Sequence, residues 1–321
     1  MKYEMVIGKD FRYNVCQKGV EHILFTDEVA PKEKGVELED LSNDFDGSVV
    51  GWIKDGTYKV STQTKGQKVI FNEDSSYMFH ERIGSYIKSI DFNNIDTSHV
   101  TNMRGMFAFC ENLEELDLNH FDTSKVEEMS DMFSGCKNLE RLDLSHFDTS
   151  KVINMRSMFD GCEQLKSLNL SNFDTSNVVY MVKMFKGCEQ LKSLNLSSFD
   201  TPNVNNISYM FSECKNLQKL NLSNFNTKNV LYMDEMFNGC KNLEKLNLSN
   251  WKLDDIAYLD GIFARCDKLT SLETTDIQLK NEYQKTVVQQ QNKMYSNIDL
   301  NNLKTNKGKE MQKDKDIDKE E

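Results

Sequence analysis

The sequence predicts an α/β solenoid, in which one short parallel strand per repeat stacks on the next and short helices cover the opposite side. Three observations lead to this fold class. Seven cysteines from Cys110 to Cys266 recur every 26 residues, and a leucine pair and a phenylalanine recur at the same spacing. A constant period of this length indicates a stacked array rather than an ordinary globular core.

Residues 139–162 show how the strand and the helix of one repeat are inferred. Leu142 and Leu144 alternate with polar residues, which is the period of a strand buried on one face. The run Val152–Phe159 then carries apolar residues at spacings of three, three and one, which predicts the buried face of a short helix. Gly161 suits the helix end. With Leu139 upstream, the L-x-x-L-x-L string is the signature of leucine-rich repeats.

Stacking is expected to place the same position of successive repeats about 4.8 Å apart, so that like residues form columns in the core. We expect the repeat cysteines to be buried, reduced thiols, with partial disulfides or metal ligation as the alternatives. An aromatic column at constant spacing is also expected to be core rather than a ligand box. These structural columns include Cys110, Cys136, Cys162, Cys188, Cys214, Cys240, Cys266, Phe133, Phe159 and Phe185.

The repeats divide the chain into three segments. Residues 78–279 are predicted to form the leucine-rich-repeat solenoid with about eight strands, the first of them near residue 87. Residues 1–77 contain short β-like runs, two of them joined by Asp55-Gly56, and are predicted to form a β-rich N-terminal cap. Residues 280–321 are polar, and we expect a disordered tail with a short helix around residues 282–295.

Composition and missing motifs argue against several functions. The net charge of −12 argues against a nucleic-acid partner, because phosphate backbones are bound by basic surfaces. The sequence has no apolar run of about 18 residues, so no transmembrane segment is predicted. No glycine-rich phosphate loop, nucleophile elbow or H-E-x-x-H motif occurs. His120 and His146 share a repeat position that later holds asparagine or serine, so they are interpreted as surface residues. We therefore expect no catalytic residue, no cofactor and no metal, and hence no enzyme.

One aspartate column requires a choice between two interpretations. Asp122, Asp148, Asp174 and Asp200 stand just before the expected helices, where a carboxylate caps orphan N–H groups. A calcium site is the alternative, since stacked carboxylates and hydroxyls offer the oxygen ligands that calcium takes. Asn226 replaces aspartate in the next copy, which a cap accepts readily.

The outward residues of the strands form the candidate ligand face. They flank each leucine pair, and their charge runs from acidic through neutral to basic along the array, while the inward positions stay constant. A varied surface on a rigid frame suits recognition of a partner, and a merely solvated sheet face is the alternative. The candidate residues are Glu115, Asp117, Arg141, Asp143, Asn169, Asn195, Lys219, Asn221, Lys245 and Asn247.

The repeat also resembles a known family. FDTSKVINMRSMFDGCEQLKSLNL, residues 147–170, is similar to the repeat of BspA-type leucine-rich-repeat surface proteins, and the lead-in at residues 46–79 resembles the segment that introduces such arrays. The resemblance covers roughly residues 46–275. It implies a cell-surface or secreted protein that acts in adhesion or in binding host or matrix proteins, with no catalytic residues. We expect the strand-lined face to recognise a protein or glycan.

Two alternative functions stay open. The first residues lack the shape of a secretory signal, so a cytoplasmic protein-interaction scaffold is the first alternative. The second alternative is an enzyme rather than a binding protein, namely a hydrolase whose activity lies in residues 1–77.

Overall fold

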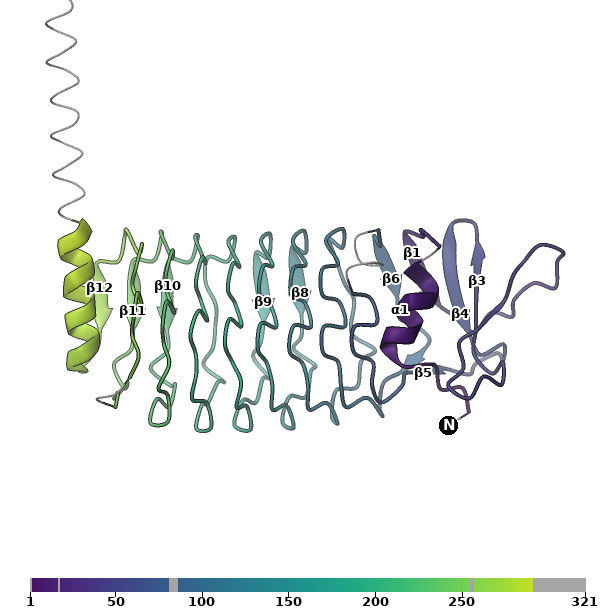
Figure 1. Ribbon diagram of the computed structural model, residues 1–321, viewed down its shortest axis with the longest axis horizontal. Coiled ribbons are helices and arrows are strands. Elements are labelled where there is room, and N and C mark those ends of the chain that lie inside the picture. The colour runs from purple at the N-terminus through teal and green to yellow at the C-terminus, as the bar shows by residue number, and fades with distance from the viewer. Residues whose placement is uncertain (1, 17, 81–85, 255–256, 291–321) are drawn as a thin grey trace, which may run out of the picture. The chain divides into compact units, whose positions relative to one another are not determined.

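The computed structural model describes residues 2–16, 18–80, 86–254 and 257–290. The chain forms two units, Met1–Asp276 and Ile277–Glu321. In the first unit a β-rich N-terminal part leads into coils of chain that follow one another in a row (Figure 1). Most coils have a short strand on one side, although residues 115–117 form none, and the other side has no regular secondary structure.

The N-terminal part contains one helix and a five-stranded sheet. The helix is α1 (Gly8–Cys16), and the sheet has the order β2-β3-β4-β1-β6. The strands are β1 (His22–Phe25), β2 (Glu39–Asp40), β3 (Val50–Lys54), β4 (Thr57–Ser61) and β6 (Ser89–Asp91). β3 and β4 are antiparallel and joined by Asp55 and Gly56, whose φ angles of 51° and 76° suit a tight hairpin turn, as the Asp-Gly pair predicts.

Strand β1 lies between the cap and the repeats, and sequence patterning did not reveal it. It pairs in parallel with β4 on one edge and with β6 on the other. Ile23 and Phe25 are buried, and the Phe25 ring stacks on Phe92 with centroids 5.7 Å apart. The chain before residue 26 thus supplies a parallel neighbour for the first strand of the array.

The strands of the repeats pair in parallel at identical repeat positions. Leu142 is the partner of Leu168, and Leu220 is the partner of Leu246, exactly one repeat later in each pair. A further parallel bridge joins Ser193 to Lys219. The remaining strands are β5 (Val69–Ile70), β7 (Ile95–Asp96), β8 (Arg141–Asp143), β9 (Ser167–Asn169), β10 (Lys219–Asn221), β11 (Lys245–Asn247) and β12 (Ser271–Glu273).

The opposite side of each coil is not helical, and the prediction of short helices is wrong there. Residues 100–110 and the matching stretches of later repeats form turns, and neighbouring repeats are joined by isolated parallel bridges. We call this the bridge side. The bridged positions are Asn102, Glu128, Asn154, Tyr180, Asn206, Tyr232 and Tyr258.

Backbone hydrogen bonding explains the absence of helices. The N–H groups of Met129, Asp131, Phe133 and Gly135 all donate to carbonyls of the following repeat, at 2.7–3.0 Å. Asp131 and Gly135 have φ angles of 57° and 72°, so two residues of the segment adopt the left-handed conformation, which a right-handed helix does not accommodate. The apolar side chains that were expected on the buried face of a helix, such as those of Met129 and Phe133, are still buried in the core. Alternate N–H groups, however, bond to the next repeat, and those between them close short turns within the repeat, as Ser134 does with the Asp131 carbonyl at 3.0 Å.

The predicted core columns are buried. The Phe133 and Phe159 rings stack with centroids 5.7 Å apart and planes 4° apart, and Phe185 continues the stack at 5.6 Å. The seven repeat cysteines are buried and free, and each thiol lies close to a phenylalanine carbonyl, as at 3.1 Å from Cys162 Sγ to Phe133 O. The side chain of Cys16 lies outside the described residues.

A buried threonine column, which the sequence interpretation missed, joins the repeats further. Thr149 Oγ1 accepts a hydrogen bond from the Asp174 N–H at 2.8 Å and donates to the Asp174 carbonyl at 2.9 Å. This hydroxyl therefore satisfies a donor and an acceptor of the next repeat, and those of Thr97, Thr123, Thr175 and Thr227 do the same. The column comprises Thr97, Thr123, Thr149, Thr175, Thr201 and Thr227, none more than 4% exposed.

The second unit begins with a helix. Residues 277–290 are helical, which overlaps the short helix expected around residues 282–295 and occupies the start of the segment assigned to the tail. The other residues assigned to that tail, 291–321, lie outside the described residues.

Candidate ligand-binding faces

The strand face consists of the ten outward residues named above, and the structure places all of them on the strand side. Nine are exposed, and Asn247 is half-buried. Where neighbouring strands pair in parallel, equivalent positions lie side by side, so that Lys219 lies beside Lys245 and Asn221 beside Asn247. Their role in binding a ligand stays a prediction.

The row of aspartates and asparagines is held rigid by its own turns. Asp143 Oδ1 accepts a hydrogen bond from the Ser145 N–H at 3.0 Å, and Asn221 Oδ1 accepts one from the Ser223 N–H at the same distance. The backbone and side-chain hydrogen bonds of Ser145 lower the pKa of Asp143. The Oδ1 atoms of Asn169, Asn195 and Asn247 accept the N–H of the residue two positions later in the same way.

The two ends of the strand face differ in charge. At the basic end Lys219 and Lys245 lie one strand spacing apart, and neither forms an ion pair with another described residue. Like charges in facing positions of a sheet repel each other. Glu115 and Asp117 form the acidic end. The face therefore holds unmatched charge of opposite sign at its two ends.

The aspartate column acts as turn caps rather than helix caps. Asp148 Oδ1 accepts the Ser150 N–H at 2.9 Å, and the side-chain and backbone hydrogen bonds of Ser150 lower the pKa of Asp148. Within the described residues, no group of three or more His, Cys, Asp or Glu side chains is placed to hold a metal. His146 Nε2 lies 2.8 Å from the Leu118 carbonyl, which gives this histidine a structural partner.

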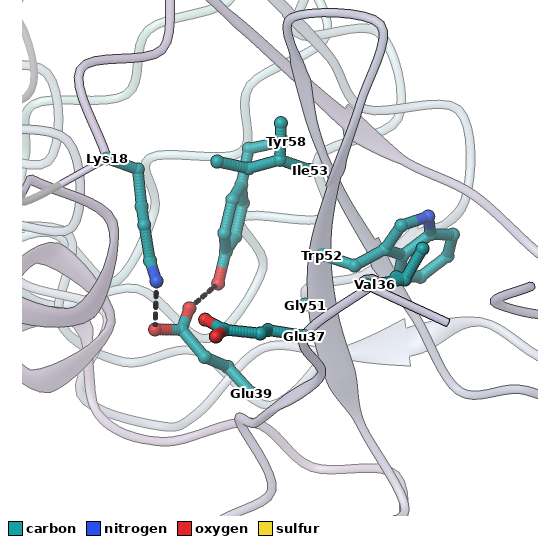
Figure 2. A pocket seen from close by; sticks show the side chains of 9 residues that line it. Lys18, Val36, Glu37, Glu39, Gly51, Trp52, Ile53 and Tyr58 are labelled. Atoms are coloured by element: carbon teal, nitrogen blue, oxygen red, sulfur yellow. Dashed lines mark hydrogen bonds and ion pairs between the residues drawn. The ribbon is translucent and has the colours of Figure 1, made fainter. Parts of the chain in front are cut away.

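A small pocket in the N-terminal part bears on the hydrolase alternative. Lys18 Nζ lies 3.0 Å from Glu39, and the Tyr58 hydroxyl donates to the same carboxylate, so both side chains point at Glu39 (Figure 2). Burial and the hydrogen bond to Glu39 raise the pKa of Tyr58. The phenol thus stays protonated as a donor. These three groups are engaged with one another, an arrangement that favours a structural role.

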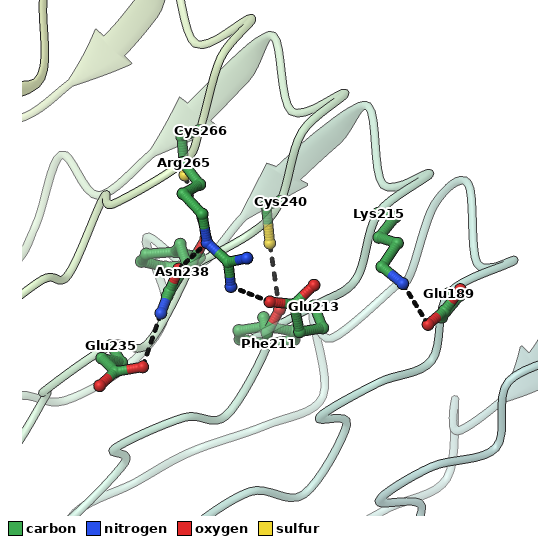
Figure 3. Close-up of polar contacts among 10 residues, drawn as sticks. Glu189, Phe211, Glu213, Lys215, Glu235, Asn238, Cys240, Arg265 and Cys266 are labelled. Carbon is green, nitrogen blue, oxygen red and sulfur yellow. Dashed lines mark hydrogen bonds and ion pairs between the residues drawn. The ribbon is translucent and has the colours of Figure 1, made fainter. Parts of the chain in front are cut away.

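The coil edge between the bridge side and the following strands carries an ion pair that spans two repeats. Arg265 pairs with Glu213, 52 residues earlier, and Arg265 Nε donates to Asn238 Oδ1 at 3.0 Å (Figure 3). The Glu213 side chain crosses Gly239, where an added Cβ would lie 2.6 Å from Glu213 Oε1. Sequence patterning had interpreted this glycine position only as a helix stop.

Similarity to known proteins decides the family. The model of a family described as "Mycoplasma protein of unknown function, DUF285" matches residues 73–194, 143–221 and 191–307, together more than half of the chain. The chain belongs to this family. The DUF285 match includes every residue of the strand face and all seven repeat cysteines.

Other similarities are remote. A crystal structure of a leucine-rich repeat protein from Eubacterium ventriosum matches at 15% identity and a TM-score of 0.25, covering 75% of this chain and 85% of that one. No curated protein matches the sequence. The assignment of this DUF285 chain therefore rests on the family model. Among its described residues, no helix has the length and apolar character needed to span a membrane.

Proposed function

We propose that this chain is a non-catalytic binding protein whose strand face recognises a protein or glycan partner. One observation carries the proposal: Lys219 and Lys245 face each other without a counter-charge among the described residues, on a row fixed by parallel pairing. A partner with an acidic group there would relieve the repulsion between the two ammonium groups. The acidic end, with Glu115 and Asp117, would face a basic part of the same partner.

The rigid backbone supports this function. The outward side chains of β8, β9, β10 and β11 flank an inward leucine within a three-residue strand, such as the buried Leu220 between Lys219 and Asn221. Turn hydrogen bonds also hold the asparagine row. A frame of this kind loses little conformational entropy on binding, which favours affinity.

The resemblance to BspA-type surface proteins supports a further part of the proposal, namely adhesion at the cell surface or after secretion. Protease treatment of intact cells tests it, followed by detection of the repeat segment. Cleavage from intact cells would support surface exposure. Complete protection in intact cells together with cleavage after lysis would instead favour the intracellular scaffold.

The binding proposal is tested by kinetics with defined probes. The full chain is immobilised and exposed to sulfated and uronic-acid glycans and to purified extracellular-matrix proteins at low ionic strength. We expect K219E/K245E to slow association with any probe that binds the strand face, because complementary charge acts mainly on the association rate. The matched control is K228E/K241E, which changes net charge equally at exposed lysines outside the strand face. Equal slowing in both double variants would contradict the proposal.

A further inference from the structure

The bridge side carries an exposed tyrosine pair near the end of the array. The Tyr232 and Tyr258 rings stack with centroids 5.0 Å apart and planes 7° apart. Their exposed fractions are 40% and 57%, which is high for large aromatic residues. Asn206 occupies the preceding bridged position, so no third ring continues this stack on that side.

Two aspartates lie beside these rings. Asp234 and Asp260 follow Tyr232 and Tyr258 by two residues, with buried Met233 and Leu259 between them, so all four polar side chains face outward. The Asp260 N–H donates to Asp234 Oδ1 at 3.2 Å, which places the two carboxylates on adjacent repeats. We call Tyr232, Asp234, Tyr258 and Asp260 the acidic tyrosine patch.

No described cation neutralises the patch. Neither Asp234 nor Asp260 forms an ion pair within the described residues, and the nearby Arg265 pairs with Glu213 instead. The charges of Glu235 and then Asp234, together with partial burial, raise the pKa of Tyr209, which indicates a negative potential at this end. The carboxylates of Asp234 and Asp260, which lie one repeat apart, therefore have no ion-pair partner among the described residues.

The same side is different earlier in the array. There Arg104 lies 3.6 Å from Asp131, and Lys183 and Lys186 lie 5.7 Å and 5.9 Å from the centroid of the Tyr209 ring. Tyr180, which is 54% exposed, has Val182 in place of the patch aspartate. Cations of the chain itself thus contact outward rings and carboxylates of the earlier repeats, whereas no ion pair or cation–π contact within the described residues involves Tyr232, Asp234, Tyr258 or Asp260.

We propose that the acidic tyrosine patch binds an arginine-rich segment of a partner protein. Guanidinium groups stack on aromatic rings and form paired hydrogen bonds with carboxylates, and the patch supplies both groups within one repeat spacing. Exposed tyrosines are also common anchors of protein interfaces. The site lies on the bridge side and is independent of the strand face.

Binding of a fluorescent nona-arginine peptide to the full chain, followed by anisotropy at low and high ionic strength, tests the proposal. We expect Y232A/Y258A and D234N/D260N each to weaken binding at least about tenfold, since each removes two of the contacts. Y180A is the matched aromatic control and D267N the charge control, and both should bind within about twofold of the wild type. Circular dichroism checks that every variant is folded.

Two outcomes would overturn the inference. Equal binding by wild type and both double variants would show that the peptide responds only to the net charge of −12. Displacement of the peptide by a neutral oligosaccharide, lost in Y232A/Y258A, would assign the rings to a glycan instead. K219E/K245E should leave peptide binding unweakened, which keeps this test separate from that of the strand face.

Discussion

The columns of the array that face its interior and those that face solvent follow opposite rules. Inside, the same residue type recurs in nearly every repeat, as in the cysteine, phenylalanine and threonine columns. Outside, a single row passes from Glu115 through Ser167 to Lys245. Each inward side chain packs on its own copy in the next repeat, so a shape that stacks on itself is required. Each outward side chain meets mainly water and is free to serve recognition.

The bridge side is an intermediate case. Its outward side chains vary, but its backbone needs left-handed residues at fixed positions, such as Asp131, Ser157 and Lys183. The strand side imposes no such demand, because extended backbone suits any side chain except proline. The constraint on residue type is therefore strongest in the interior, weaker on the bridge side and weakest on the strand side.

Ionisation of the buried cysteine thiols should have the largest effect on the free energy of unfolding, because it tests the packing of the interior columns. Burial raises the pKa of Cys136, Cys214 and Cys266 to about 12 and raises those of the other repeat thiols too. Because the folded pKa values lie above the unfolded value of about 8.5, the stability is complete below that pH and is lost as pH rises toward the folded values. The slope should approach about 1.4 kcal/mol per pH unit for each thiol.

Urea unfolding from about pH 8 to about pH 10.5 measures this loss, since the range extends about two units above the pKa of the unfolded thiols. C136A/C162A serves as the control, because it removes two of the seven titrating thiols and should give a shallower slope. A urea midpoint that stays constant over this range would contradict the buried thiol column. So would rapid thiol labelling of the native protein.

Removal of one hydroxyl from the threonine column should have the next largest effect. Thr149→Val leaves the Asp174 N–H and carbonyl without their partner, and we expect a loss of about 3 kcal/mol in the free energy of unfolding. Thr270→Val is the matched control, since that hydroxyl is exposed and its contact to the Glu244 carbonyl is 3.5 Å long. Equal losses in the two variants would refute the role of the column.

Gly239→Ala tests the constraint at the coil edge. The new Cβ would meet the Glu213 carboxylate in a residue with φ of 78°, and we expect a loss of about 2 kcal/mol. Gly56→Ala has nearly the same φ, 76°, but no neighbour within 4 Å, so it reports backbone strain alone. In an E213A background the extra loss at Gly239 should disappear; if it persists, the contact with Glu213 is not its cause.

Ser157→Gly should stabilise the protein, by about 1 kcal/mol, because glycine adopts the φ of 53° without a steric penalty. Thermal or urea unfolding measures the gain. Ser167→Gly, in strand β9, should be destabilising instead, because glycine weakens a strand. A loss of stability in both variants would contradict the left-handed conformation on the bridge side.

K219E/K245E should have the smallest effect on stability. Exposed charges contribute little to folding, so the free energy of unfolding should change by less than about 0.5 kcal/mol, while association with a strand-face ligand slows. Chemical unfolding measures the change in stability, and the binding kinetics measure the change in association rate, so the two effects are separated. A large loss of stability would mean that the two lysines belong to the frame and not to a free surface.

Much of the architecture could be predicted from the repeat itself. The 26-residue period, the inward columns and the order of charge along Glu115, Arg141 and Lys219 are all visible in the letters. The Asp55-Gly56 turn was also predictable from local backbone preference. Each of these depends on which side of the chain a residue faces, which periodicity reports, or on a local dihedral angle, which residue type reports.

Only the tertiary structure decided where the backbone N–H groups bond and which distant residues meet. The run Val152–Phe159 has the apolar spacing of a helix, yet the N–H groups of Met155, Ser157 and Phe159 donate to carbonyls of the next repeat. Apolar spacing fixes the inward face and leaves the hydrogen-bond partners open. The pairing of β1 with β6, and the meeting of Asp234 with Asp260 beside two rings, likewise arise from stacking, which brings together residues that are far apart in the chain.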